Sequence, residues 1–168
     1  MLGRTAVVAL ASLATMACAN STGPAEAVPA VLAVVPASGA TGVSLTAPVM
    51  VTFSHSMMPG MEANVLLHEG LLTGPVITGS AAWSTDRRTL TFTPSAALKP
   101  GTTYLLHLAP TLVAANGQGI DHGACTALGG QNVTGAMTGG GMMGSGMMGS
   151  GWEMSSGSYG MIFRFTTA

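Results

Sequence analysis

Short runs of alternating apolar and polar residues, each bounded by turn residues, set the strongest limit on how this chain can fold. In residues 48–54, Val49, Val51 and Phe53 share one face of an extended chain, which is the pattern of a strand with one buried side. Further strands are expected at residues 31–35, 64–68, 74–78, 102–108 and 161–167. No stretch shows a helical repeat, and strands at intervals of roughly 8–12 residues predict an all-β sandwich.

The clearest hairpin spans residues 81–93 and turns at residues 85–87. Trp83 and Tyr104 are expected in the core, with the Tyr104 hydroxyl fixing a strand corner. The alternation predicts that six side chains from different strands share one interior: Val51, Phe53, Leu90, Phe92, Leu106 and Phe165.

Residues 1–19 differ from the rest of the chain and predict an export signal. Arg4 precedes an apolar run over residues 5–17, which is too short for a membrane-spanning helix, since such a helix needs about 20 residues. Thr15-Met16-Ala17-Cys18 resembles the lipobox of bacterial lipoproteins, in which the cysteine is acylated, with Thr15 where leucine is usual. Ala17-Cys18-Ala19 also fits the cleavage site of ordinary signal peptidase.

We favour lipidation at Cys18, because the polar residues 20–30 that follow would then serve as a flexible tether. The expected location is the cell envelope, in the periplasm or on the outer surface, with an N-terminal lipid as the membrane anchor. Either cleavage leaves Cys125 without an intrachain partner, so a disulfide framework is excluded.

Charge is scarce, with five basic and six acidic residues and no basic run. The chain therefore lacks the electrostatic pattern of a nucleic-acid-binding protein. It also lacks the polybasic patch that draws proteins to anionic membranes.

A family pattern appears in five segments: Val35-Pro-Ala-Ser-Gly-Ala-Thr-Gly-Val43, Val51-Thr-Phe-Ser-His-Ser-Met57, Arg88-Thr-Leu-Thr-Phe-Thr-Pro94, Leu98-Lys-Pro-Gly-Thr-Thr-Tyr104 and Phe163-Arg-Phe-Thr-Thr167. Their content and order resemble the bacterial Ig-like domain of the S-layer SbsA type, over about residues 34–110 plus the last strand. The resemblance implies an immunoglobulin-like sandwich of about seven strands, used as a module of surface or secreted proteins, and implies no catalytic residues.

The chain departs from that family between Tyr104 and the last strand, where the family has a modest loop. Here residues 111–160 intervene, and we expect a long glycine- and methionine-rich loop inserted into a sandwich of residues 31–168. The unit Met-Met-Gly-Ser-Gly recurs with a period of five over residues 142–151.

Methionine is the only abundant functional side chain of this insertion, and thioether sulfur is a soft ligand suited to Cu(I) or Ag(I). Methionine-rich segments recur in periplasmic copper-handling proteins, including sandwiches of the CopC type, and the chain is similar to these in composition and architecture. The candidate ligands are Met137, Met142, Met143, Met147, Met148, Met154 and Met161, with His122 and Cys125 as a possible nitrogen and thiolate.

Two other interpretations of the insertion stay open. Its methionines would serve as adaptable hydrophobes that cover the sandwich or another protein, or they would act as a sacrificial trap for oxidants. We favour the first of these over a metal site, because composition alone under-specifies a site.

Two further groups of residues outside the insertion contain candidate metal ligands. Met57 is expected to pack under its strand, while His55, Met58 and Met61 could face the insertion. His68 and His107 each lie between apolar neighbours on expected strands, which is commoner for structural histidines than for ligands.

The chain contains no nucleophile elbow, zinc-protease motif, Walker loop or dinucleotide fingerprint. A triad through Asp121 and His122 is unsupported, because a glycine-rich insertion does not fix catalytic geometry. The sequence thus predicts a non-enzymatic Ig-like module of the cell envelope with a structural or interaction role. The alternative is a soft-metal binder.

Overall fold

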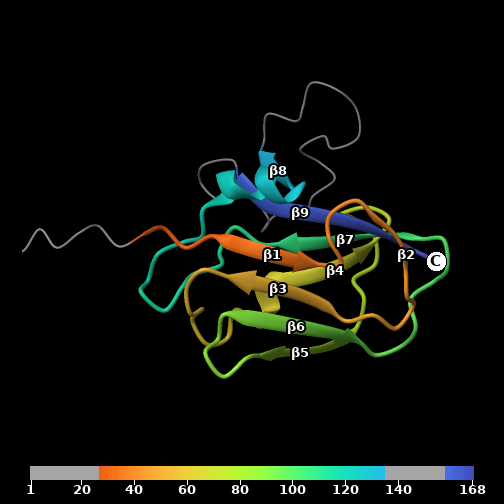
Figure 1. Cartoon of the computed structure of the whole chain (residues 1–168), viewed down its shortest axis with the longest axis horizontal. Coiled ribbons are helices and arrows are strands. Elements are labelled where there is room, and N and C mark those ends of the chain that lie inside the picture. The colour runs from red at the N-terminus through yellow and green to blue at the C-terminus, as the bar shows by residue number, and fades with distance from the viewer. Residues whose placement is uncertain (1–26, 135–157) are drawn as a thin grey trace, which may run out of the picture.

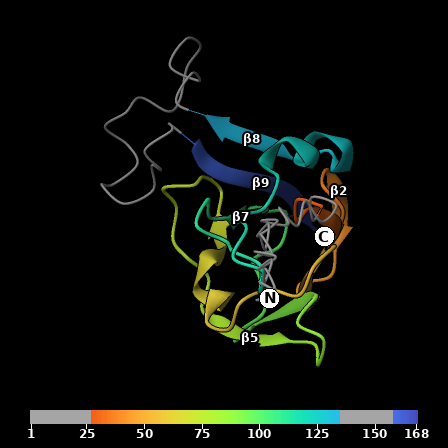
Figure 2. The same ribbon diagram turned by 90° about the vertical axis from the view of Figure 1, so that its left-hand side faces the viewer.

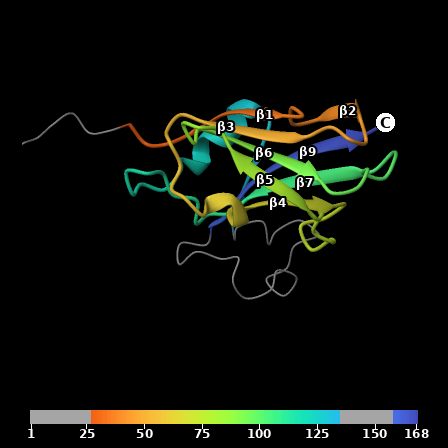
Figure 3. The same cartoon turned by 90° about the horizontal axis from the view of Figure 1, so that it is seen from below.

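The structure is a computed structural model that describes residues 27–134 and 158–168, and its strands form two facing sheets (Figure 1). The first sheet is antiparallel, in the order β1-β3-β6-β5, and consists of β1 (Val31–Val35), β3 (Val49–Phe53), β5 (Gly79–Trp83) and β6 (Thr89–Pro94). The second sheet has the order β2-β9-β7-β4, with β8 also paired to β9. It contains β2 (Ala40–Val43), β4 (Val65–Glu69), β7 (Thr103–Leu108), β8 (Gln131–Thr134) and β9 (Ser158–Thr167). In Figure 3 the strands of both sheets follow one another from top to bottom, from β1 to β5 in the first sheet and from β2 to β4 in the second.

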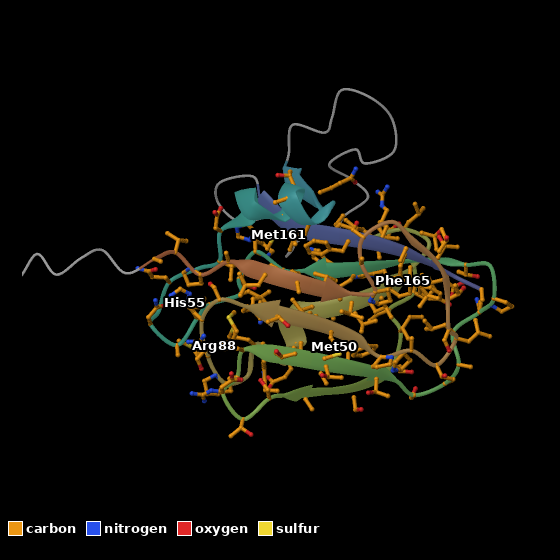
Figure 4. All side chains as sticks on the ribbon, viewed as in Figure 1. Met50, His55, Arg88, Met161 and Phe165 are labelled. Atoms are coloured by element: carbon orange, nitrogen blue, oxygen red, sulfur yellow. The ribbon has the colours of Figure 1, made fainter. Side chains whose placement is uncertain are left out.

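The interior lies between these sheets and is built by the alternation of side chains along each strand. In β3 the burial pattern is strictly alternating, with Val49, Val51 and Phe53 buried and the residues between them half-buried. All six side chains expected to share one interior belong to a single core cluster, so that prediction is confirmed. Met50 lies on the outer face of β3, whereas Phe165 of β9 points into the core (Figure 4).

The predicted hairpin is confirmed as β5 and β6, which pair from Gly79↔Pro94 to Trp83↔Leu90. Its turn is closed by Asp86, whose Oδ1 accepts hydrogen bonds from the Ser84 hydroxyl at 2.6 Å and from the Arg88 N–H at 3.1 Å. These bonds hold the pKa of the Asp86 carboxyl below its usual value, the Ser84 bond contributing most. Trp83 is half-buried and packs at the margin of the core, its ring centroid 5.9 Å from that of Phe53.

Two strand predictions differ from the structure. Residues 74–78 form no strand, because only Val76 bridges to His68 before the chain crosses to β5 in the other sheet. The turn cluster around residues 37–42, by contrast, contributes β2, which pairs in parallel with β9. The described residues form nine strands, where the family resemblance implied about seven.

The first half of the expected insertion is part of the sandwich. Leu112, Ala114, Ile120 and Cys125 are buried in the main core, and their burial fixes this stretch despite its glycines. The chain then forms a 3-10 helix, η2 (His122–Leu128), and the strand β8 along β9 (Figure 2). A second 3-10 helix, η1 (Met61–Asn64), precedes β4. No helix among the described residues is long and apolar enough to cross a membrane.

Candidate functional site

The η2 helix carries His122 and Cys125, two of the three predicted ligands that the structure describes; the third, Met161, lies on β9. The first two are three residues apart, and side chains at this spacing lie on one side of a 3-10 helix. His122 is half-buried, and burial lowers the pKa of its imidazole, an effect that the charge of Asp121 partly offsets. This imidazole is therefore neutral at neutral pH.

Cys125 has no solvent exposure and belongs to the main core cluster. Burial raises the pKa of its thiol, so the sulfur keeps its proton at neutral pH. Metal ligation requires the thiolate, so this environment favours a packing role for Cys125.

The segment after β3 holds the second predicted group, His55, Met57, Met58 and Met61. Met57 is fully buried in the core and bridges Ala114, so its predicted packing role is confirmed. Met61 accepts a hydrogen bond at its sulfur from the Asn64 amide at 3.6 Å. The His55 Nδ1 atom lies 2.8 Å from the Ser54 hydroxyl, and Met58 is exposed. Met57, Met61 and His55 thus each contact different neighbours, and Met58 is exposed.

Tyr104 fixes the corner that leads into β7, as predicted. Its ring stacks on Phe165 with the centroids 5.8 Å apart, and its hydroxyl accepts a hydrogen bond from the Lys99 N–H at 2.9 Å. Lys99 in turn forms a salt bridge with Glu69 at 2.6 Å. A cavity of about 200 Å³ lies beside this corner, which is smaller than the roughly 300–1,000 Å³ of typical small-molecule sites.

His68 of β4 and His107 of β7 are brought together by strand pairing. Their ring centroids are 6.0 Å apart, and their exposed fractions are 1% and 0%. The His68 Nδ1 atom lies 3.3 Å from the Gly74 carbonyl oxygen. Burial lowers the pKa of the His68 imidazole, and the bond to Gly74 raises it in part.

This pair is the arrangement that sequence reasoning missed. Each histidine was assigned to a strand, yet which residues of β4 oppose which residues of β7 depends on the register. The alternation along β7 was the available signal. Leu106 and Leu108 are predicted to face inward, so Leu105 and His107 must lie on the opposite face of the strand.

Several predicted site residues lie outside the described residues: Cys18, Met137, Met142, Met143, Met147, Met148 and Met154. Met161 is described and is fully buried in the core. Within residues 27–134 and 158–168, no three or more His, Cys, Asp or Glu side chains gather as metal ligands would.

Comparison with solved structures finds low similarity. The S-layer protein rSbsC(31-844) matches with 18% identity and a TM-score of 0.42, over 56% of this chain and 12% of the S-layer chain. PcoC from Escherichia coli, described as a methionine-rich copper resistance protein, matches with 13% identity and a TM-score of 0.49, over 84% of this chain and 100% of its own. CopC from Methylosinus trichosporium OB3b matches with 16% identity and a TM-score of 0.43, over 55% of this chain and 84% of its own.

This chain spans only about an eighth of the length of the S-layer protein that it matches. No curated protein sequence matches it. The model of the bacterial Ig-like domain, however, matches residues 25–124, which is more than half of the chain. Together with the two-sheet core, this match shows that the chain belongs to the bacterial Ig-like domain family.

Proposed function

We propose that this chain is a non-enzymatic Ig-like module of the bacterial cell envelope, with a structural or interaction role. The main support is the family membership, together with the observation that polar side chains of this chain hydrogen-bond backbone groups at turns and strand ends. Asp86 closes a hairpin, Tyr104 fixes a corner, and Thr167 accepts a hydrogen bond from the Thr102 N–H at 3.0 Å. Each of these groups satisfies backbone donors at a turn or strand end.

The non-enzymatic role is tested at Asp121 and His122, the pair that a hydrolase would use. The double variant Asp121→Asn/His122→Ala is expected to restore a deletion strain as fully as the wild-type chain does. Loss of complementation by a folded, normally exported double variant would contradict a role confined to scaffold and interaction, because it would show that Asp121 or His122 takes part in the function.

A lipid anchor at Cys18 is the proposed link to the membrane, with residues 20–30 as the tether. Cell fractionation tests it: the wild-type chain is expected in the membrane fraction and the Cys18→Ala variant in the soluble fraction or the medium. Mass spectrometry of the mature chain is expected to show an acylated N-terminal Cys18. A mature chain that begins after Cys18 would exclude lipidation.

Soft-metal binding by the methionine-rich segment (residues 135–157) is the second candidate. The supporting observation is the pairing of Thr134 of β8 with Ser158 of β9, which holds the two ends of this segment side by side. Because the two ends are held together, we expect a higher effective concentration of the thioethers of Met142, Met143, Met147 and Met148 for a soft cation.

Titration with Cu(I) against a chromogenic chelator tests this candidate. Replacing the four methionines by leucine is expected to remove the sulfur-coordinated copper, and Met58→Leu, an exposed methionine elsewhere, is the matched control. X-ray absorption spectroscopy should report sulfur neighbours in the wild-type chain. Equal copper content and an equal sulfur signal in the four-leucine variant would reject it.

A further inference from the structure

The outer faces of the two sheets differ in burial. On the first sheet, the row Val35, Met50 and Thr91 is exposed or half-buried, and no side chain on the outer face of its described strands is buried. On the second sheet, four outward-facing side chains have exposed fractions between 0% and 2%: His68, Leu105, His107 and Ile162. A sheet face in contact with solvent does not bury leucine and isoleucine to this extent, so the second sheet is covered on its outer side.

Strand register joins these four side chains into one patch. His68 of β4 pairs with Leu105 of β7, and His107 of β7 pairs with Ile162 of β9. The neighbouring Leu106 belongs to the main core cluster and points the other way, whereas Leu105 and Ile162 are buried outside that cluster. The patch is therefore a second buried apolar surface, on the side of the sheet opposite the core.

The described chain accounts for the β4 side of this patch. After β4, residues 70–76 fold beside the strand: Val76 bridges His68, and the Gly74 carbonyl oxygen lies 3.3 Å from the His68 Nδ1 atom. Leu72 in this stretch is also buried outside the main core cluster. Because β7 separates β4 from β9, these residues do not explain the burial of Ile162.

The two 3-10 helices lie elsewhere. η2 contacts β8, β1 and β9 and places Cys125 in the main core, so it packs on the core side of the second sheet. η1 contacts β4 and β5, which belong to different sheets, and so it lies at the margin between the layers. Within the described ranges, no helix or strand therefore accounts for the burial of His107 and Ile162.

The methionine-rich segment has the position and length to fill this place. It starts after Thr134 and ends before Ser158, which lies on the same strand as Ile162 at a distance of about 13 Å, at roughly 3.3 Å per residue. A loop of this length that is closed at its ends reaches at most about 38 Å, half of its extended length. Residues 1–26, by contrast, precede β1 of the first sheet.

The composition of the segment also suits an apolar surface. Its only charged residue is Glu153, and Trp152 and the methionines are its large side chains. Methionine is unbranched and polarizable, so it fits irregular apolar surfaces and packs well against aromatic and imidazole rings. The glycines between the methionine pairs let the backbone follow the sheet.

We propose that the methionine-rich segment docks on the outer face of the second sheet, with its methionine and Trp152 side chains packed on Leu105 and Ile162. This assigns its methionines the role of adaptable hydrophobes and names the surface that they contact. The inference depends on neither proposed function, because apolar packing requires no metal and no lipid anchor.

Methyl NMR on the full-length chain tests the docking without any substitution. The chain is labelled at the methionine ε-methyl groups and at the leucine and isoleucine methyl groups. Nuclear Overhauser effects are expected from segment methionines to Leu105 and Ile162, and none to Leu32, which is exposed on β1 of the other sheet. Their absence at Leu105 and Ile162, or their appearance at Leu32 instead, would overturn the proposal.

A mixed sample distinguishes the segment of the same chain from that of a second copy. Half of the molecules carry labelled methionine only, and the other half carry labelled leucine and isoleucine only. The effects at Leu105 and Ile162 are expected to vanish in this mixture, because both groups belong to one chain. Effects that persist would assign the surface to a second copy and reject the proposal.

Oxidation by hydrogen peroxide gives a second measure, since docked methionines react more slowly than exposed ones. The segment methionines are expected to react at least about threefold faster in Ile162→Ser than in the wild-type chain, because the surface that holds them is weakened. Val35→Ser, on the exposed outer face of the first sheet, is the matched control and should leave the rates unchanged. Equal rates in the wild-type chain and in an Ile162→Ser variant that is folded by near-UV circular dichroism would reject the docking. If this variant does not fold, the methyl NMR decides.

Discussion

Tyr104 shows how much one hydroxyl contributes at the corner before β7. Its oxygen accepts the Lys99 N–H, and Tyr104→Phe leaves that part-buried donor without this partner. We expect a loss of about 1–2 kcal/mol in the free energy of unfolding, measured by urea denaturation. Thr91→Val, which removes a half-buried hydroxyl on the outer face of β6, is the control and should stay within about 0.5 kcal/mol. Equal effects of the two changes would contradict the role of the corner.

Cys125 offers a direct check of core packing in the first half of the expected insertion. Because its thiol is buried and its pKa raised, we expect no reaction with a thiol reagent in native buffer and full reaction in denaturant. The measurement uses a Cys18→Ser background, so that Cys125 is the single thiol. Rapid labelling of the native chain would show that this stretch opens readily.

His68 makes stability fall on acidification. Its pKa is lower in the folded chain than in the unfolded chain, so the unfolded state takes up a proton first as the pH falls below about 6.5. Stability is therefore complete above this pH and declines below it, by at most about 1.4 kcal/mol per pH unit for each such group. His122, whose pKa is also lowered, adds to the same decline.

The expected outcome is a shallower pH dependence in His68→Gln and a still shallower one in the His68→Gln/His122→Gln double variant. Chemical denaturation between pH 4 and 8 measures it (a range chosen to bracket about 6.5). A slope unchanged in both variants would assign the acid sensitivity to other groups.

At the scale of elements, the sequence predicts those strands in which the alternation of apolar residues and the turn residues agree. It misses strands that are recognisable only by the strand with which they pair. β3, β6 and the end of β9 alternate cleanly, and the turn of β5–β6 has its own Asp86 cap. β2 has only the sequence Ala-Thr-Gly-Val, and its partner β9 lies at the other end of the chain. Such a short parallel pairing leaves no local pattern, and the His68–His107 contact depends on register in the same way.

The packing of β8 and η2 against β9 depends on Gly130. A Cβ atom at this position would lie 2.8 Å from the Phe163 ring carbon Cδ1, and that ring is held in the core. We expect Gly130→Ala to lower the free energy of unfolding by about 1–3 kcal/mol, because the ring or the strand has to move.

Gly119→Ala is the matched control for this change. Its Cβ would meet nothing closer than the Leu112 carbonyl oxygen at 3.9 Å, so its effect should stay within about 0.5 kcal/mol. Thermal unfolding of both variants checks the difference. A neutral Gly130→Ala would mean that β8 shifts freely along Phe163.

At the scale of the whole molecule, the sandwich takes its core from both sides of the methionine-rich segment. Leu112, Ile120 and Cys125 precede the segment and Phe163 and Phe165 follow it, all in one cluster. The two flanking strands are already paired at Thr134↔Ser158. The chain thus forms one continuous sandwich, and the two ends of the methionine-rich segment lie next to each other on the paired strands β8 and β9.

Replacing residues 135–157 by Asn-Gly would turn β8 and β9 into a tight hairpin, because this dipeptide favours the two-residue turn between paired strands. Unfolding is expected to remain cooperative. The shorter connection loses less entropy on closing, which favours folding by up to about 2 kcal/mol, whereas exposure of Leu105 and Ile162 would oppose this gain. Copper binding through the sulfurs of the segment should disappear. Loss of cooperative unfolding in this variant would show that the segment is required for the sandwich, and the division of the molecule into a sandwich and an appended segment would be wrong.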